Sequence, residues 1–282
     1  MPDTERHANA GRHIVIVTSL VIAGVALASL TVLPAWRVEL DVLGSPMSVG
    51  ASADWLVAVL LVVFTAVGMS DLVRDEIGHE HVDLRYTTTF WTLPCLVTLA
   101  AVAAVTQQAS VDVSGWLTSV VLLGVLLAAV LAAEYGTIHL DSPHYRTARL
   151  GLNVATYGAA FALYGTLYGL QVRSLLSATA VMLVTFPLAL ELLRGTEEQL
   201  ATTWLHAGII ALVLGELTWA LNRWGLGALA GGGLLLVVFY TLSGLTQQYL
   251  AGRLTRRVVL EFVAIGLVGL LVIAFSSPWL TG

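Results

Sequence analysis

The stretch "WLTSVVLLGVLLAAVLAAEYGTIHLDSPHYR", residues 116–146, joins an apolar run to a segment dense in polar side chains. The run 116–133 contains no charged residue. A helix needs about 20 mainly apolar residues to cross the hydrocarbon of a bilayer. The run therefore predicts a membrane-spanning helix, and the polar segment after it would lie at a membrane surface.

The rest of the chain has the composition of this run. Its 282 residues are 57% hydrophobic and only 11% charged, whereas a soluble domain carries about 25% charged residues. Charge is scarce in bilayer-spanning segments because an unpaired charge in hydrocarbon is costly. We therefore expect an integral membrane protein whose partner is the lipid bilayer, with no nucleic-acid partner. All thirteen basic residues are Arg, which excludes Schiff-base and phosphate-loop chemistry that needs a Lys.

Further apolar runs predict an all-α, polytopic transmembrane helix bundle, folded as a single domain over residues 1–282. Residues 1–12 are expected to form a cytoplasmic tail before a first helix that is retained in the protein. The second run is short, so eight spans are the alternative to about nine. The nine runs lie near 13–34, 54–70, 88–106, 116–133, 149–170, 174–193, 203–221, 227–244 and 258–276.

Arginine placement predicts the orientation of the bundle. With the N-terminus inside, ten of the thirteen Arg residues fall in the inner segments, as the positive-inside rule requires. We expect a protein of the bacterial plasma membrane with a cytoplasmic N-terminus and an external C-terminus. All seven His residues then lie on the inner side.

One segment outside the helices has a strand pattern. In "RVELDVLGSPMSV", residues 37–49, polar and apolar residues alternate on both sides of Gly44-Ser45-Pro46. This pattern is typical of a hairpin and predicts a small β-hairpin over residues 37–50 on the outer face.

The polar segment after residue 133 could bind a metal ion or form a solvated loop. His139, Asp141 and His144 follow an H-x-D-x-x-H spacing, and such ligands suit zinc or non-haem iron. Polar loops produce similar triplets by chance, so we favour the loop and expect no metal cofactor. With Glu134 and Glu191 at the same inner side, these residues would form the site of a lipid-active enzyme, which is one alternative function.

The fifth predicted helix has two distinct faces. At 100° per residue its polar residues fall within an arc of about 60° and its glycines within about 40° on nearly the opposite side. A glycine face allows close approach of another helix, and the tyrosine face would then meet a different neighbour or an apolar ligand. The polar face consists of Asn153, Tyr157, Tyr164 and Tyr168, and the glycine face of Gly151, Gly158, Gly165 and Gly169.

Two features of the next helices complete the candidate residues. The eighth predicted helix carries a second small-residue seam, Gly227-x-x-x-Gly231. Glu216 lies about 20 Å into the seventh, and an acid at such a depth suggests function. It could join the tyrosines in a ligand slot or form the centre of a proton- or ion-coupled transporter. The structural alternative is a carboxyl that is protonated or paired with Arg223.

Three stretches resemble an uncharacterised bacterial family of multi-pass membrane proteins. They are "AEYGTIHLDSPHYRTARLGLN", "ELTWALNRWGLG" and "GRLTRRVVLEF", from residues 133, 216 and 252 onward. The resemblance implies neither an activity nor a ligand.

The sequence favours a non-enzymatic protein. We expect an accessory or scaffold subunit, or a binder of a lipid-like or pigment-like apolar ligand, that associates with a membrane protein partner or with further copies of itself. No other cofactor is expected. The lipid-active enzyme and the Glu216 transporter are the alternatives.

Overall fold

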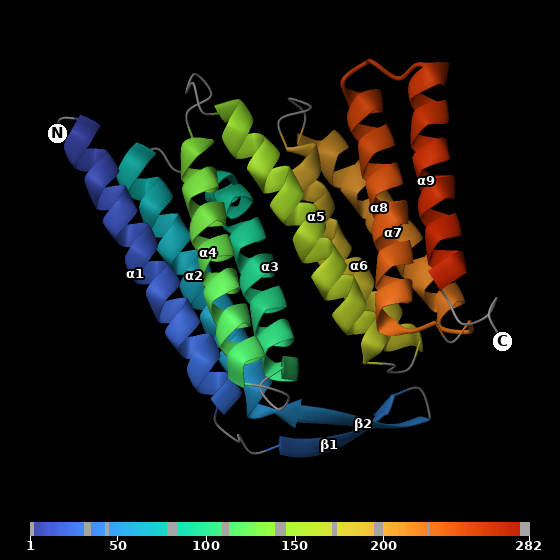
Figure 1. The fold of residues 1–282 in the computed structure, drawn as a ribbon, viewed down its shortest axis with the longest axis horizontal. Coiled ribbons are helices and arrows are strands. Elements are labelled where there is room, and N and C mark those ends of the chain that lie inside the picture. The colour runs from blue at the N-terminus through green and yellow to red at the C-terminus, as the bar shows by residue number, and fades with distance from the viewer. Residues whose placement is uncertain are drawn as a thin grey trace. The chain divides into compact units, whose positions relative to one another are not determined.

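The computed structural model describes residues 3–30, 35–42, 45–77, 84–108, 113–138, 145–170, 174–194, 200–224 and 226–276. Within these ranges, nine helices and two strands follow one another in the order α1, β1, β2 and α2 to α9 (Figure 1). The chain forms two compact units, Met1–Arg149 and Leu150–Gly282. The single domain over residues 1–282 stays a prediction.

The first unit contains four helices and a pair of strands. The strands pair antiparallel, from Ala35 opposite Ser52 to Val42 opposite Ser45, and so extend beyond the predicted range 37–50 at both ends. The elements are α1 Asp3–Leu30, β1 Ala35–Val42, β2 Ser45–Ser52, α2 Ala53–Ile77, α3 Leu84–Gln108 and α4 Val113–Gly136.

Two helix boundaries in this unit differ from the prediction. α1 begins at Asp3, so most of the predicted tail 1–12 is helical. α2 continues to Ile77, well past the run 54–70, because residues with polar side chains extend the helix beyond its apolar part. Hydropathy identifies the apolar part of a helix, but it does not identify the residues at which the helix begins and ends.

Polar side chains join the helices of the first unit within an apolar core. Thr65 of α2 and Thr98 of α3 are both fully buried, and their hydroxyl oxygens lie 3.1 Å apart. The indole nitrogen of Trp116, in the first turn of α4, donates to the hydroxyl of Ser29 near the end of α1 at 2.9 Å. These bonds fix the pairing of α2 with α3 and of α1 with α4.

In its described residues the second unit contains helices and the turns between them, and no strand. The helix α5 starts just before the unit boundary. At one end of the unit α5 and α7 end and α6 and α8 begin, and we call this the Leu221 end. α6 and α8 end where α7 and α9 begin, and we call this the Arg194 end. The helices are α5 Tyr145–Gly169, α6 Ser174–Leu193, α7 Leu200–Leu221, α8 Ala228–Leu250 and α9 Arg256–Ser276.

Six helices of the described chain are long and apolar enough to cross a membrane, so the chain is a helical membrane protein. The predicted spans 88–106, 149–170 and 258–276 lie in α3, α5 and α9, which do not meet that criterion in full. In α3 the residues with described side chains form the apolar segment Phe90–Val105. The six are Asn9–Leu30, Leu56–Ile77, Val113–Gly136, Leu175–Leu193, Ala201–Leu221 and Ala228–Leu250.

Candidate functional site

Two tyrosine hydroxyls of α5 are bonded to side chains of the second unit. Tyr164 lies 2.9 Å from the hydroxyl of Thr185 on α6, and Tyr157 lies 3.2 Å from the hydroxyl of Ser243 on α8. Thr185 and Ser243 each donate their own hydrogen to a backbone carbonyl one turn earlier, at 2.7 Å. A hydroxyl has only one hydrogen, so both tyrosines are the donors.

A third tyrosine and a glutamine donate hydrogen bonds to carbonyl groups at the ends of neighbouring helices. The hydroxyl of Tyr168 donates to the carbonyl of Leu221, the last residue of α7, at 2.9 Å. At the opposite end of the unit, the amide of Gln247 on α8 donates to the carbonyl of Leu192 at the end of α6 at 2.7 Å. The last carbonyls of a helix have no partner within it, so these side chains act as caps supplied by other helices.

The rings of these tyrosines fill the space between the helices. Phe239 of α8 lies edge-on to both Tyr157 and Tyr164, with ring centroids 5.9 Å apart in each pair. Tyr164 is 0% exposed and Tyr168 is 3% exposed. Asn153 is half-buried and makes none of these contacts. The polar face of α5 therefore contacts protein groups from α6, α7 and α8.

Part of the glycine face packs against α8. A Cβ atom on Gly232 of α8 would lie 2.6 Å from the Cα atom of Gly165, a distance that no side chain adjustment can relieve. One on Gly169 would lie 3.0 Å from the Cβ atom of Ala228. α8 thus contacts the glycine face and the tyrosine face of α5 alike, whereas the sequence predicted different neighbours, because this close crossing lets Phe239 reach the tyrosine side.

The remaining glycines of the predicted seams differ in their surroundings. A Cβ atom on Gly231 would collide with the ring of Tyr168. Cβ atoms on Gly151, Gly158 and Gly227 would have nothing within 4 Å. The close crossing is therefore confined to the part of α5 near the Leu221 end, and Gly232 rather than Gly227 belongs to it.

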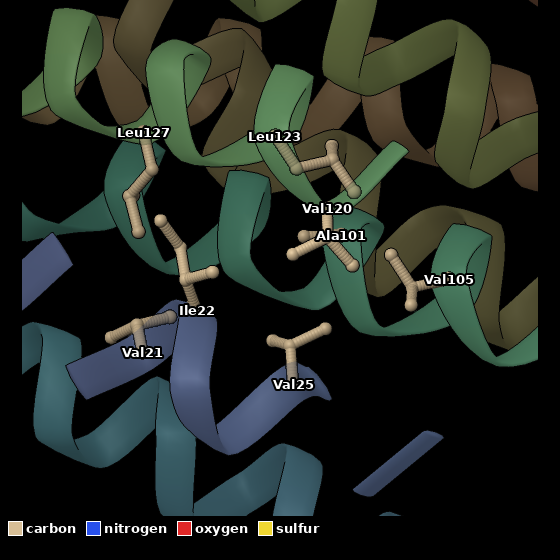
Figure 2. A pocket seen from close by; sticks show the side chains of 8 residues that line it. All are labelled: Val21, Ile22, Val25, Ala101, Val105, Val120, Leu123 and Leu127. Carbon is tan, nitrogen blue, oxygen red and sulfur yellow. The ribbon is translucent and has the colours of Figure 1, made fainter. Parts of the chain in front are cut away.

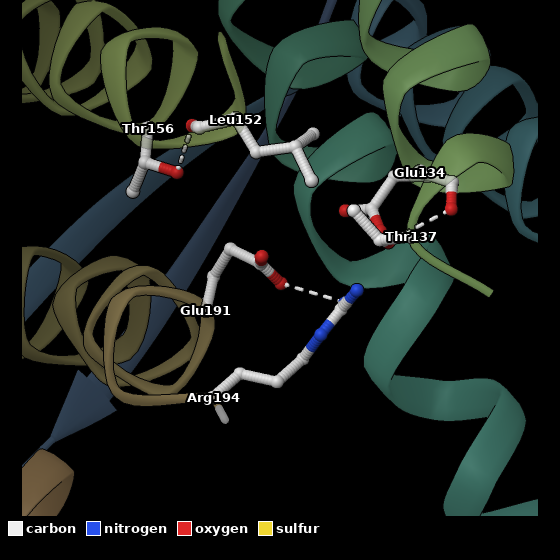
Figure 3. A network of polar contacts seen from close by, with 6 residues as sticks. All are labelled: Glu134, Thr137, Leu152, Thr156, Glu191 and Arg194. Carbon is white, nitrogen blue, oxygen red and sulfur yellow. Dashed lines mark hydrogen bonds and ion pairs between the residues drawn. The ribbon is translucent and has the colours of Figure 1, made fainter. Parts of the chain in front are cut away.

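Two carboxylates near helix ends are buried. In the second unit, Glu191 is 2% exposed and its carboxylate lies 3.2 Å from the guanidinium of Arg194 (Figure 3). In the first unit, Glu134 is 0% exposed, and the hydroxyl of Thr137 donates to its backbone carbonyl at 2.9 Å. A buried carboxylate needs polar partners, and Arg194 supplies one for Glu191.

The predicted metal ligands His139, Asp141 and His144 lie outside the described residues. Among the residues that are described, no three His, Cys, Asp or Glu side chains form a group that could hold a metal ion.

Changing His139 and His144 together to Gln is expected to leave the melting temperature and the metal content unchanged. This follows from the solvated loop that the sequence predicts, because substitutions at a surface away from special features change stability little. Elemental analysis of the purified protein beside the double variant tests this. A stoichiometric ion that is present in the wild type and lost from the variant would contradict it and would support the enzyme alternative.

A small cavity lies in the first unit between α1, α3 and α4 (Figure 2). Its volume of about 10 Å³ is close to the space that one water needs, far below that of a lipid or pigment. The lining is apolar and consists of Val21, Ile22, Val25, Ala101, Val105, Val120, Leu123 and Leu127.

Glu216 is exposed on α7, away from the tyrosines of α5. In the described part of the chain no ion pair joins it to Arg223, the partner that the structural alternative proposed. The structure therefore does not bring Glu216 and the tyrosines together in one site.

Three polar side chains that bond to other helices were missing from the sequence-based candidates. Thr185, Ser243 and Gln247 are each 21 to 86 residues away in the chain from the groups that they contact. Their signal in the sequence is a hydrogen-bonding side chain inside or beside an apolar run.

Comparison with known proteins adds one match. The family described as Protein of unknown function (DUF5656) matches the chain over residues 32–276. No curated protein and no solved structure matches it.

Proposed function

The chain belongs to the DUF5656 family, and we propose that this member is a non-enzymatic accessory or scaffold subunit of a membrane protein complex. The alternative of a binder for a lipid-like or pigment-like ligand has less support, because the tyrosines that would line its slot have protein partners.

The observation that carries the proposal is that polar side chains of α5 form hydrogen bonds to other helices of the second unit. The hydroxyls of Tyr157, Tyr164 and Tyr168 are each bonded to another helix. In a membrane such bonds join helices that have no hydrophobic driving force between them. The polar residues of α5 therefore support a packing role, which suits a scaffold.

Tyr164→Phe tests the packing role against ligand binding. Phe keeps the ring and loses one hydrogen bond to Thr185, which retains its bond to the Val181 carbonyl. We expect a loss of about 1 kcal/mol or less in unfolding free energy and no change in co-purifying molecules. Denaturation in detergent and native mass spectrometry of the gently purified protein measure the two effects.

Thr179→Val is the matched control, because its exposed hydroxyl bonds only to the carbonyl one turn earlier. A stoichiometric apolar molecule in the wild type that is lost from Tyr164→Phe, but kept in the control, would contradict the scaffold proposal.

We further propose that all nine helices cross the bacterial plasma membrane, with the N-terminus cytoplasmic. A Cys placed at Ser45 should react with a membrane-impermeant maleimide in intact cells, and one placed at Ser142 should not. The native Cys95 is 6% exposed and should give little background. The reverse labelling pattern would show the opposite orientation.

A further inference from the structure

One face of α7 has the spacing of a helix-packing seam and carries a carboxylate. Its residues recur at alternating intervals of four and three, which is the spacing of the a and d positions of a heptad. All of them are exposed in the second unit. The α7 face consists of Leu205, Ile209, Leu212, Glu216 and Trp219, and the exposed Arg223 follows in the turn after α7.

Glu216 lies within the apolar part of this face. It is five residues before Leu221, the last residue of α7, so it lies about 8 Å along the axis from that end. Its neighbours on the face, Leu212 and Trp219, are 52% and 58% exposed. Ionisable residues in membrane helices rarely face lipid and usually pair with one another. The position of Glu216 therefore calls for a group that donates hydrogen bonds or carries positive charge.

Among the described residues of the second unit, no Arg side chain pairs with Glu216. Arg223 lies in the turn after α7, two residues beyond the end of the helix, and no ion pair joins it to Glu216 in the described residues. A second copy with the same membrane orientation would place its own Glu216 opposite this one. Two facing carboxylates repel each other unless one is protonated, so a pair of identical α7 faces is disfavoured.

We propose that the α7 face binds a transmembrane helix of another membrane protein, which places a Lys or Arg side chain at the depth of Glu216. This inference rests on the proposed scaffold function and names the partner of that function. The carboxylate within this apolar face favours a helix with a basic residue over lipid chains, because ionisable residues in membrane helices usually pair with one another.

The test uses the full chain in phosphatidylcholine vesicles and two synthetic transmembrane peptides of alternating Leu and Ala. One peptide carries a Lys about 8 Å from its outer end, and the other carries Met there. Energy transfer between labelled protein and labelled peptide gives the association constants. We expect the Lys peptide to bind about threefold to thirtyfold more tightly than the Met peptide.

Variants show whether the carboxylate causes this preference. In Glu216→Gln the two peptides should bind equally. In Glu261→Gln, which removes an exposed carboxylate from α9, the preference should remain. Both replaced side chains are exposed, and an unchanged melting temperature would show that each variant is folded.

Three results would overturn the inference: no preference in the wild type, a preference that persists in Glu216→Gln, or self-association of the protein that Glu216→Gln abolishes. The last result would assign the α7 face to a second copy. None of them affects the readout for the scaffold proposal, which is the absence of a co-purifying ligand in the wild type.

Discussion

Arg194→Met is expected to lower the free energy of unfolding by about 3 kcal/mol, the lower end of the range for breaking a buried ion pair. The guanidinium lies 3.2 Å from the carboxylate of Glu191, whose side chain is 1% exposed. Met keeps the packing of the Arg stem but removes the charge beside a buried carboxylate. The lower end applies because the Arg194 side chain is 16% exposed, so water can replace part of its effect.

A double variant separates the lost charge pair from lost packing. Replacing Glu191 by Leu together with Arg194→Met removes the buried charge as well, and such replacements of whole pairs are often neutral. We expect the double variant to be more stable than Arg194→Met alone in detergent denaturation. A double variant that is as unstable as the single one would show that Arg194 acts through packing.

Gly232→Ala is expected to cost about 1–3 kcal/mol, the usual range for overpacking. The new methyl group would lie 2.6 Å from the Cα atom and 2.7 Å from the nitrogen of Gly165. Both are backbone atoms, so α5 and α8 would have to move apart. That movement would stretch the bond between Tyr157 and Ser243, which joins the same two helices.

Gly158→Ala is the control for Gly232→Ala, because a Cβ atom at Gly158 meets nothing within 4 Å. Ala is favoured over Gly in a helix by up to about 1 kcal/mol, so this variant should melt at or above the wild-type temperature. Even Gly158→Leu should be tolerated, although the glycine periodicity of the sequence alone predicts a close crossing there. Equal melting temperatures for Gly232→Ala and Gly158→Ala would show that the α5–α8 crossing is not close.

Hydropathy and periodicity predict where the helices and strands lie in the sequence, but they predict poorly which of these elements contact one another. Each apolar run overlaps one of the described helices, and the residue alternation around Gly44 coincides with β1 and β2. The ends of α1 and α2 extend past the apolar runs, because helices continue through polar residues. Periodicity places Gly158 and Gly165 on one face of α5, but it does not show at which of these residues another helix crosses. That depends on where α8 crosses α5, which is a non-local property.

In the candidate site too, the residues on one helix could be predicted from the sequence, whereas their partners on other helices could not. The tyrosines of α5 were predicted as a group from their spacing, since residues on one helical face are fixed by local geometry. Their partners Thr185, Ser243 and Leu221 come from three other helices, and no single-sequence pattern joins such positions. Glu216 was grouped with the tyrosines because of its depth, and depth alone does not determine which way a helical residue points.

The cap on α6 has a consequence for synthesis. Translation delivers Leu192 to the membrane before Gln247, whose amide bonds to its carbonyl. The end of α6 therefore stays open while α7 and most of α8 are still being made. By contrast, α7 finds its cap already present, since Tyr168 precedes Leu221. A nascent chain released before residue 247 would lack this bond, and the carbonyl of Leu192 would have no partner from α8.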